Sequence, residues 1–185
     1  MKLEAVFLDR DGVLNPHIPG GYLLRAEDVT VLPDVAAAVR RLNDAGVRVI
    51  VISNQQGVGK GLMTRADLDA IERRMSEILE REAGAFLDGC YYSTERAGEN
   101  SPRRKPQPGM LLEAARDFGL TLAQTVFAGD SATDIQAGHA AGVGRTALLL
   151  SGGILAYAEG DLNPAPDLVF SDLASLVDWV LEQQR

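Results

Sequence analysis

The chain has 185 residues, of which 46% are hydrophobic and 24% are charged. This size and composition exclude an intrinsically disordered protein, and we expect a single globular domain over residues 1–185. The net charge of -8 excludes a broad nucleic-acid surface, because binding a phosphate backbone requires a basic field.

The apolar stretches of the chain are short. None approaches the roughly 20 residues that a membrane-spanning helix requires, and the N-terminus lacks a signal-peptide pattern. The single cysteine, Cys90, can form neither an internal disulfide nor a multi-cysteine zinc site, so we expect it in the core. We predict a cytoplasmic protein, a monomer or small homo-oligomer, that binds neither membrane nor nucleic acid.

Short apolar, β-branched runs alternate with segments of helical spacing along the chain. Thr64 and Asp67 resemble a capping box at the start of the longest helix, and Ser171 is a good N-cap for a closing helix. We expect strands at residues 5–8, 47–52, 86–92, 125–128, 146–150 and 168–170, and helices at 34–45, 64–83, 108–118 and 131–141. This alternation predicts an α/β fold with a doubly wound, Rossmann-like parallel sheet. The segments 13–32 and 93–103 are too short for a large cap domain.

Polar residues gather where the predicted strands end. In chain order they are Asp9, Asp11, Ser53, Asn54, Asp130 and Asp134, with Lys105 placed just before the helix that Pro108 opens. Ligands of open parallel sheets bind beyond the carboxyl ends of the strands, so we expect these side chains to meet at one edge.

These residue types meet the requirements of phosphate transfer. A carboxylate can attack phosphorus, and a second acid can protonate the leaving oxygen and later deprotonate water. Oxygen ligands hold Mg²⁺, while lysine and serine can neutralise and hydrogen-bond the phosphate. The sequence therefore predicts a phosphate-transfer site.

Four ordered segments carry a family resemblance: Phe-Leu-Asp9-Arg-Asp11-Gly12-Val, Ser53-Asn54-Gln55, Arg104-Lys105-Pro106 and Gly129-Asp130-Ser-Ala-Thr-Asp134. They resemble the motifs of the haloacid dehalogenase superfamily of phosphatases, and the residues within them are similar to those of its histidinol-phosphatase-like branch. The resemblance implies the fold of that superfamily, with Asp9 as nucleophile and Asp11 as general acid/base. It also implies Mg²⁺ bound by Asp9, the Asp11 backbone carbonyl and Asp130, with Asp134 in support. Phosphate and substrate would be bound by Ser53, Asn54, Arg104 and Lys105.

The sequence departs from this branch at one loop. Many members carry zinc there on a Cys-x-His and a Cys-x-Cys pair, and the corresponding positions here are Ser93, Glu95, Ser101 and Arg103. None of these residues offers a thiolate or an imidazole, so we predict that zinc is absent.

The substrate is the most open part of the prediction. We expect a sugar phosphate, with a heptose 1,7-bisphosphate hydrolysed at its 7-phosphate as the first choice. Histidinol phosphate or another small phosphomonoester is the alternative. His17, Tyr22, Arg25 and Lys60 are candidates for discriminating among substrates, and the glycines around Lys60 predict a flexible turn rather than a nucleotide-binding loop. A phospho-accepting receiver domain and a non-catalytic binding module are alternatives from other classes.

Overall fold

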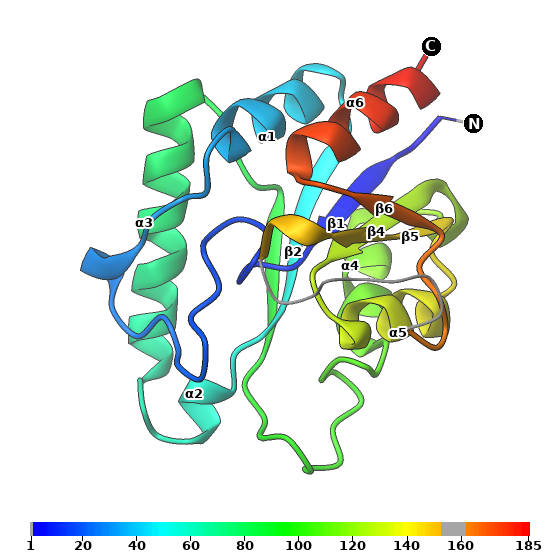
Figure 1. Cartoon of the computed structure of the whole chain (residues 1–185). Helices are drawn as coiled ribbons and strands as arrows, with labels where there is room; N and C mark the ends of the chain where they lie inside the picture. Colours follow the sequence, from blue (N-terminus) through cyan, green and yellow to red (C-terminus); the bar gives the residue numbers. More distant parts are fainter. Residues whose placement is uncertain (1, 153–161) are drawn as a thin grey trace.

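A six-stranded, all-parallel sheet forms the centre of the molecule. The computed structural model describes residues 2–152 and 162–185. The strands are β1 (Ala5–Leu8), β2 (Arg48–Asn54), β3 (Gly89–Ser93), β4 (Thr125–Gly129), β5 (Arg145–Leu149) and β6 (Leu168–Phe170). They lie in the order β3-β2-β1-β4-β5-β6, so the chain starts in the middle of the sheet and winds outward in both directions (Figure 1). This arrangement confirms the predicted doubly wound α/β fold.

Helices cover both faces of this sheet. On one face lie α1 (Val35–Asp44), α3 (Arg65–Ala83) and α6 (Leu173–Gln183), and on the other lie α4 (Gly109–Phe118) and α5 (Ala132–Ala141) (Figure 1). The short helix α2 (Gln56–Gly59) follows β2, and 3₁₀ turns occupy Ala26–Asp28, Leu122–Gln124 and Leu150–Gly152. None of the helices in residues 2–152 and 162–185 combines the length and the apolar character needed to cross a membrane.

The sheet is buried on both faces, which explains why its central strands are apolar throughout. In β1, Val6 and Leu8 face the core under α1, α3 and α6, whereas Phe7 packs with Ile50 and Phe127 in the core under α4 and α5. Successive side chains of a strand point to opposite faces, so one short run contributes to two cores. This packing holds β1 rigid and fixes the place where the acidic segment after it begins.

Several element boundaries differ from those predicted. The expected strand over 86–92 begins at Gly89, because Phe86 is exposed and its amide donates to the Asn43 side chain. The last helix is capped by Asp172 and not by Ser171. The glycine-containing stretch after β2, predicted as a flexible turn, forms helix α2 at its start. By contrast, the capping box of Thr64 and Asp67 is confirmed.

Candidate active site

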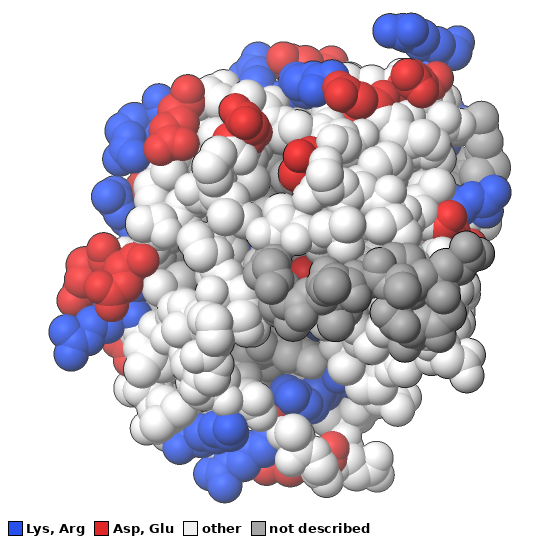
Figure 2. Space-filling model, in the orientation of Figure 1, with Lys and Arg blue, Asp and Glu red and all other residues white. Residues whose placement is uncertain are grey.

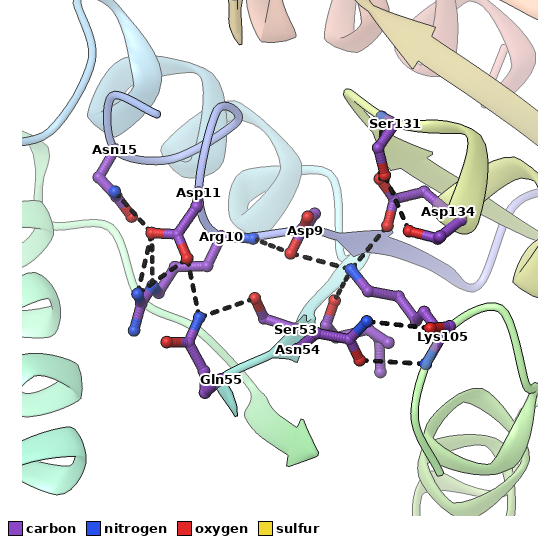
Figure 3. A network of polar contacts seen from close by, with 12 residues as sticks. Asp9, Arg10, Asp11, Asn15, Ser53, Asn54, Gln55, Lys105, Ser131 and Asp134 are labelled. Carbon is purple, nitrogen blue, oxygen red and sulfur yellow. Dashed lines mark hydrogen bonds and ion pairs between the residues drawn. The ribbon is translucent and has the colours of Figure 1, made fainter. Parts of the chain in front are cut away.

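The carboxyl edge of the sheet gathers the predicted polar residues. Asp9 follows β1, Ser53 lies in β2 and Lys105 comes from the loop that precedes α4 (Figure 3). Asp130 follows β4. All four side chains are buried. They meet because neighbouring parallel strands deliver their carboxyl ends to the same edge.

Lys105 is the centre of this group. Its Nζ lies 3.0 Å from Asp9 Oδ1 and 2.6 Å from Asp134 Oδ1, and it donates to the Ile52 carbonyl oxygen at 2.9 Å. The Asn54 side chain fixes the backbone of Lys105, since its amide group donates to the Lys105 carbonyl and accepts from the Lys105 amide, both at 3.0 Å. The ammonium group is therefore positioned by two independent sets of contacts, and the Asn54 amide is engaged with the chain itself.

The site has more buried negative charge than Lys105 can balance. Carboxylate oxygens of Asp9, Asp130 and Asp134 all lie within 4.8 Å of one another. Burial raises the pKa of Asp9 to about 6, although the charge of Lys105 opposes this shift. Burial, with the neighbouring charge of Asp9, raises the pKa of Asp130 to about 8. A second cation beside these carboxylates would lower the free-energy cost of burying their negative charge.

The donor set at the carboxylates fits a hard divalent cation. Asp130 Oδ2 is buried and has no hydrogen-bond partner among the described residues. Asp134 Oδ2 is already engaged, since it accepts from the Ser131 amide at 3.0 Å and from the Ser131 hydroxyl at 2.6 Å. Buried polar atoms are normally satisfied, and an oxygen-only set suits Mg²⁺. The orphaned oxygen of Asp130 is thus a ready ligand, while Asp134 is oriented by Ser131.

Gly12 allows the chain to pass close to this orphaned oxygen. Its φ is +86°, and a Cβ built at this position would lie 1.8 Å from Asp130 Oδ2. Both the left-handed backbone and the close approach require a residue without a side chain. The glycine after the two acids is therefore explained by the geometry of the site.

Asp11 points to a different set of partners from Asp9 (Figure 3). Arg10 Nη2 donates to both of its carboxylate oxygens at 2.9 Å, Asn15 Nδ2 donates to Oδ1 at 2.9 Å, and Gln55 Nε2 donates to Oδ2 at 2.8 Å. Burial favours a higher pKa for Asp11, but the Arg10 charge and these hydrogen bonds outweigh it and lower that pKa. The second acid is thus held as an oriented carboxylate.

Three of the residues around Asp11 were not among the predicted site residues: Arg10, Asn15 and Gln55. Arg10 is only 1% exposed, which is unusual for its residue type, and its partner is the adjacent acid. Arg10 and Gln55 lie within the motifs that carry the family resemblance, and Asn15 follows Asp11 by four residues, but no role was assigned to them.

A cavity of about 210 Å³ opens above the carboxylates. Asp9, Asp11, Ser53, Lys105 and Asp130 form its floor, and His17, Ile18 and Tyr22 of the first loop form part of its wall. The Tyr22 hydroxyl accepts from Lys60 Nζ at 2.8 Å and from Gln56 Nε2 at 3.0 Å. Of the four residues predicted to discriminate among substrates, His17 and Tyr22 line the cavity and Lys60 supports Tyr22. Arg25 is exposed and pairs with Glu27 instead.

A second cavity of about 320 Å³ adjoins the first. Loop residues 97–101 and Arg104 line it, and it shares Lys105 and Thr133 with the cavity above the carboxylates. Figure 2 shows Lys and Arg side chains gathered at the lower edge of the molecule, where α2 and the loop after β3 lie in Figure 1. Acidic side chains lie among these basic ones, and Glu99 lines the second cavity together with Arg104 and Lys105.

A larger hollow of the described chain lies elsewhere. It measures about 520 Å³ and lies near the amino ends of β1 and β2, at the opposite edge of the sheet. Its acids already have backbone partners: Glu4 accepts from the Thr121 amide at 2.7 Å, and Asp88 accepts from the Val49 amide at 2.8 Å. Size alone therefore does not identify the reactive site, and the smaller cavity carries the chemistry.

The fold and this site match one protein class. A family model described as haloacid dehalogenase-like hydrolase matches residues 3–142, and the chain belongs to this family. A D-glycero-D-manno-heptose-1,7-bisphosphate 7-phosphatase of Thermosynechococcus vestitus is 39% identical, covering 97% of this chain and 96% of that protein. The D-glycero-beta-D-manno-heptose-1,7-bisphosphate 7-phosphatase of Haemophilus ducreyi is 34% identical over 97% of this chain and all of its own length.

Solved structures give the same family. The D,D-heptose 1,7-bisphosphate phosphatase of B. bronchiseptica, in complex with magnesium and phosphate, superposes with a TM-score of 0.83. It is 30% identical, and the match covers 99% of each chain. The family resemblance read from the sequence motifs is thereby confirmed.

Proposed function

We propose that this protein is a Mg²⁺-dependent phosphatase that hydrolyses a phosphate monoester through a covalent phosphoryl group on Asp9. One observation carries the proposal: Asp9 lies beside a fixed Lys105 and the orphaned oxygen of Asp130, while a separately held second acid, Asp11, faces the same cavity. This arrangement supplies a nucleophile, positive charge for the phosphoryl oxygens and a proton donor within one site.

In the first half of the reaction, a carboxylate oxygen of Asp9 attacks phosphorus. The bond between phosphorus and the ester oxygen breaks, and the leaving oxygen takes a proton from Asp11, which enters this step as the protonated acid. Lys105 and Ser53 bind the phosphoryl oxygens, where negative charge accumulates. Because Asp9 Oδ1 accepts from the Arg10 amide at 2.7 Å and contacts Lys105, the carboxylate is oriented before substrate arrives.

In the second half, water hydrolyses the acyl phosphate. Asp11 takes a proton from this water as its oxygen bonds to phosphorus, and the bond between phosphorus and Asp9 breaks. Inorganic phosphate leaves, Asp9 is a free carboxylate again, and Asp11 carries the proton that it donates in the next cycle. The contacts of Asp11 with Arg10, Asn15 and Gln55 favour its deprotonated form, which is the form this step requires.

The metal ligands in this proposal are Asp9, the Asp11 backbone carbonyl and Asp130. Bound Mg²⁺ would supply the additional positive charge for the phosphoryl oxygens. Asp134 keeps its place through Ser131 and Lys105 and acts as a positioning residue for this group. Oxygen ligands and unbalanced negative charge both favour this assignment.

For the substrate, we propose a sugar phosphate, with D-glycero-D-manno-heptose 1,7-bisphosphate hydrolysed at its 7-phosphate. The names of the relatives support this choice, and so do the two adjoining cavities, which offer room for the reacting phosphate and for a second anionic group near Arg104. We further propose that residues 1–185 act as one domain in the cytoplasm on this small molecule, without membrane or nucleic acid.

The test is phosphate release from a panel of esters with and without Mg²⁺. The panel contains both anomers of the heptose bisphosphate, histidinol phosphate and an aryl phosphate. We expect Mg²⁺-dependent release with a strong preference for one heptose bisphosphate. A preference for histidinol phosphate would contradict the substrate, and turnover that is unaffected by chelation of Mg²⁺ would contradict the mechanism.

A matched pair of variants tests the nucleophile. Asp9→Asn removes the attacking oxygen at an almost unchanged side-chain volume, and we expect turnover to be abolished while the circular dichroism spectrum is retained. Asp69→Asn makes the same chemical change at an exposed ion pair with Arg65, and we expect it to behave as wild type. Wild-type activity in Asp9→Asn would refute the assignment.

A further inference from the structure

The resemblance implies that many members of the branch carry a zinc ion on the loop after β3. Residues 94–104 connect β3 to Lys105, and five of them line the second cavity together with Arg104. The positions that correspond to the zinc ligands are Ser93, Glu95, Ser101 and Arg103. Structural zinc takes thiolates and imidazoles, and a guanidinium group is always protonated and has no lone pair to offer. These residues do not fit zinc.

The same four positions nevertheless meet in space. The Ser93 hydroxyl donates to Glu95 Oε2 at 2.6 Å, and the Ser101 hydroxyl oxygen accepts from the backbone amides of Arg103 and Arg104 at 3.2 and 3.3 Å. The hydrogen bond from Ser93 lowers the pKa of Glu95, and Ser101 and Arg103 act in the same direction. Side-chain contacts therefore fix both ends of the loop, with Ser93 paired to Glu95 at its start and Ser101 holding the backbone of Arg103 and Arg104 at its end.

Arg103 ties the loop to the rest of the fold. Its Nη1 pairs with Glu113 in α4, and its Nη2 donates to the Tyr92 carbonyl oxygen of β3 at 3.1 Å. The Arg103 and Glu113 side chains are 36% and 27% exposed, so water screens the pair only in part. A single side chain thus joins the loop to a strand and to a helix on the same side of the site.

We propose that the contacts of Arg103 with Glu113 and Tyr92, together with the polar contacts of Ser93, Glu95 and Ser101, fix the loop as a bound metal ion would. We call this set of contacts the clasp, and we assign Arg103 as the positioning residue for Arg104. The Arg104 Nη1 donates to the Glu95 carbonyl oxygen at 3.0 Å, so its direction depends on the clasped loop. Lys105 depends on other contacts, because Asn54, Asp9 and Asp134 hold it. Loosening the clasp therefore disturbs Arg104 and spares Lys105.

Two variants break the clasp, and one serves as the matched control. Glu113→Gln removes the charge of the pair and leaves every arginine in place, while Arg103→Met removes both contacts of the guanidinium group. Arg116→Met removes an exposed arginine of the same helix, paired with its neighbour Asp117, and leaves the loop untouched. A charge-exchanged double variant, Arg103→Glu with Glu113→Arg, tests rescue of the pair.

The first readout needs no substrate and follows trypsin cleavage at Arg96, which lies within the loop. Because a part-buried, charge-assisted contact is lost, we expect cleavage on the order of tenfold faster in Glu113→Gln and Arg103→Met, with wild-type rates in Arg116→Met. The charge-exchanged variant should recover part of the protection. Metal analysis of the purified wild-type protein should find no stoichiometric zinc, and a zinc chelator should leave the cleavage rate unchanged.

The second readout rests on the proposed function. With the heptose bisphosphate we expect the two clasp variants to raise KM several-fold while kcat stays within about twofold of wild type, the pattern of lost binding contacts. One zinc ion per chain whose removal loosens the loop would overturn the proposal. So would clasp variants that match Arg116→Met in cleavage rate. If no sugar phosphate is hydrolysed, the proposed substrate fails, and the cleavage and zinc measurements still decide on the clasp.

Discussion

Replacing Gly12 by alanine should disable the site while leaving the fold in place. The new Cβ would lie 1.8 Å from Asp130 Oδ2 and 2.7 Å from its Cγ, so the carboxylate must move by an ångström or more. Displacement of a positioned group by about 1 Å can cost about 100-fold in rate. The φ of +86° adds a backbone cost of about 1–2 kcal/mol, which lowers Tm by about 2–8 °C in a chain of this length.

Gly46→Ala separates the backbone cost of a positive φ from the displacement of the Asp130 carboxylate. Gly46 has a φ of +70° at the end of α1, and a Cβ there meets nothing within 4 Å. It should show a similar loss of Tm but keep kcat/KM within about threefold of wild type. For Gly12→Ala we expect kcat/KM to fall about 100-fold or more and the Mg²⁺ concentration for half-maximal activity to rise. If Gly12→Ala and Gly46→Ala lose the same Tm and both keep wild-type kcat/KM and Mg²⁺ dependence, the account of Asp130 is refuted.

Two further predictions concern parts of the chain outside the site. Asp172→Ala should lower the free energy of unfolding by about 1 kcal/mol in urea titrations, whereas Ser171→Ala should cost less, because Asp172 caps α6. The Ser175 amide and hydroxyl lower the pKa of Asp172 in the folded protein. Stabilisation by the cap is therefore complete at a pH above the pKa that Asp172 has in the unfolded chain, and it is lost as the pH falls through the lower pKa of the folded protein. Wild type and Asp172→Ala should therefore converge in stability in acid, and a constant difference would contradict the cap. Burial raises the pKa of Cys90 to about 12, so its alkylation should be roughly 1000-fold slower than in the urea-unfolded chain, and equal rates would place the thiol at the surface.

The sequence was sufficient to place the acidic strand ends because two strong regularities act there. Buried β-branched runs identify parallel strands, and such strands deliver the residues after them to one edge, as the positions of Asp9 and Asp130 illustrate. The position of Lys105 near those acids could also be predicted, because Lys105 lies just before a helix that packs on the same sheet. These features depend on local pattern and on topology.

Features that depend on burial in the folded chain, on long-range contacts or on exact backbone angles were missed. Arg10 is of a type normally found at the surface, and only the folded chain shows it buried against Asp11. Gln55 reaches Asp11 from 44 residues away, a pairing that no local pattern encodes. Ser171 and Asp172 are both good capping residues, so the choice between them depended on backbone angles that side-chain preference does not reveal.

The central claim is that phosphate passes through Asp9, and trapping that acyl phosphate tests it most directly. The protein would be mixed with Mg²⁺ and radiolabelled substrate, quenched in acid within one turnover, reduced with borohydride and mapped by peptide mass spectrometry. We predict label on the protein before reduction and conversion of residue 9 to homoserine after it, with neither signal in Asp9→Asn. Label on another residue, or full turnover by Asp9→Asn, would contradict the account.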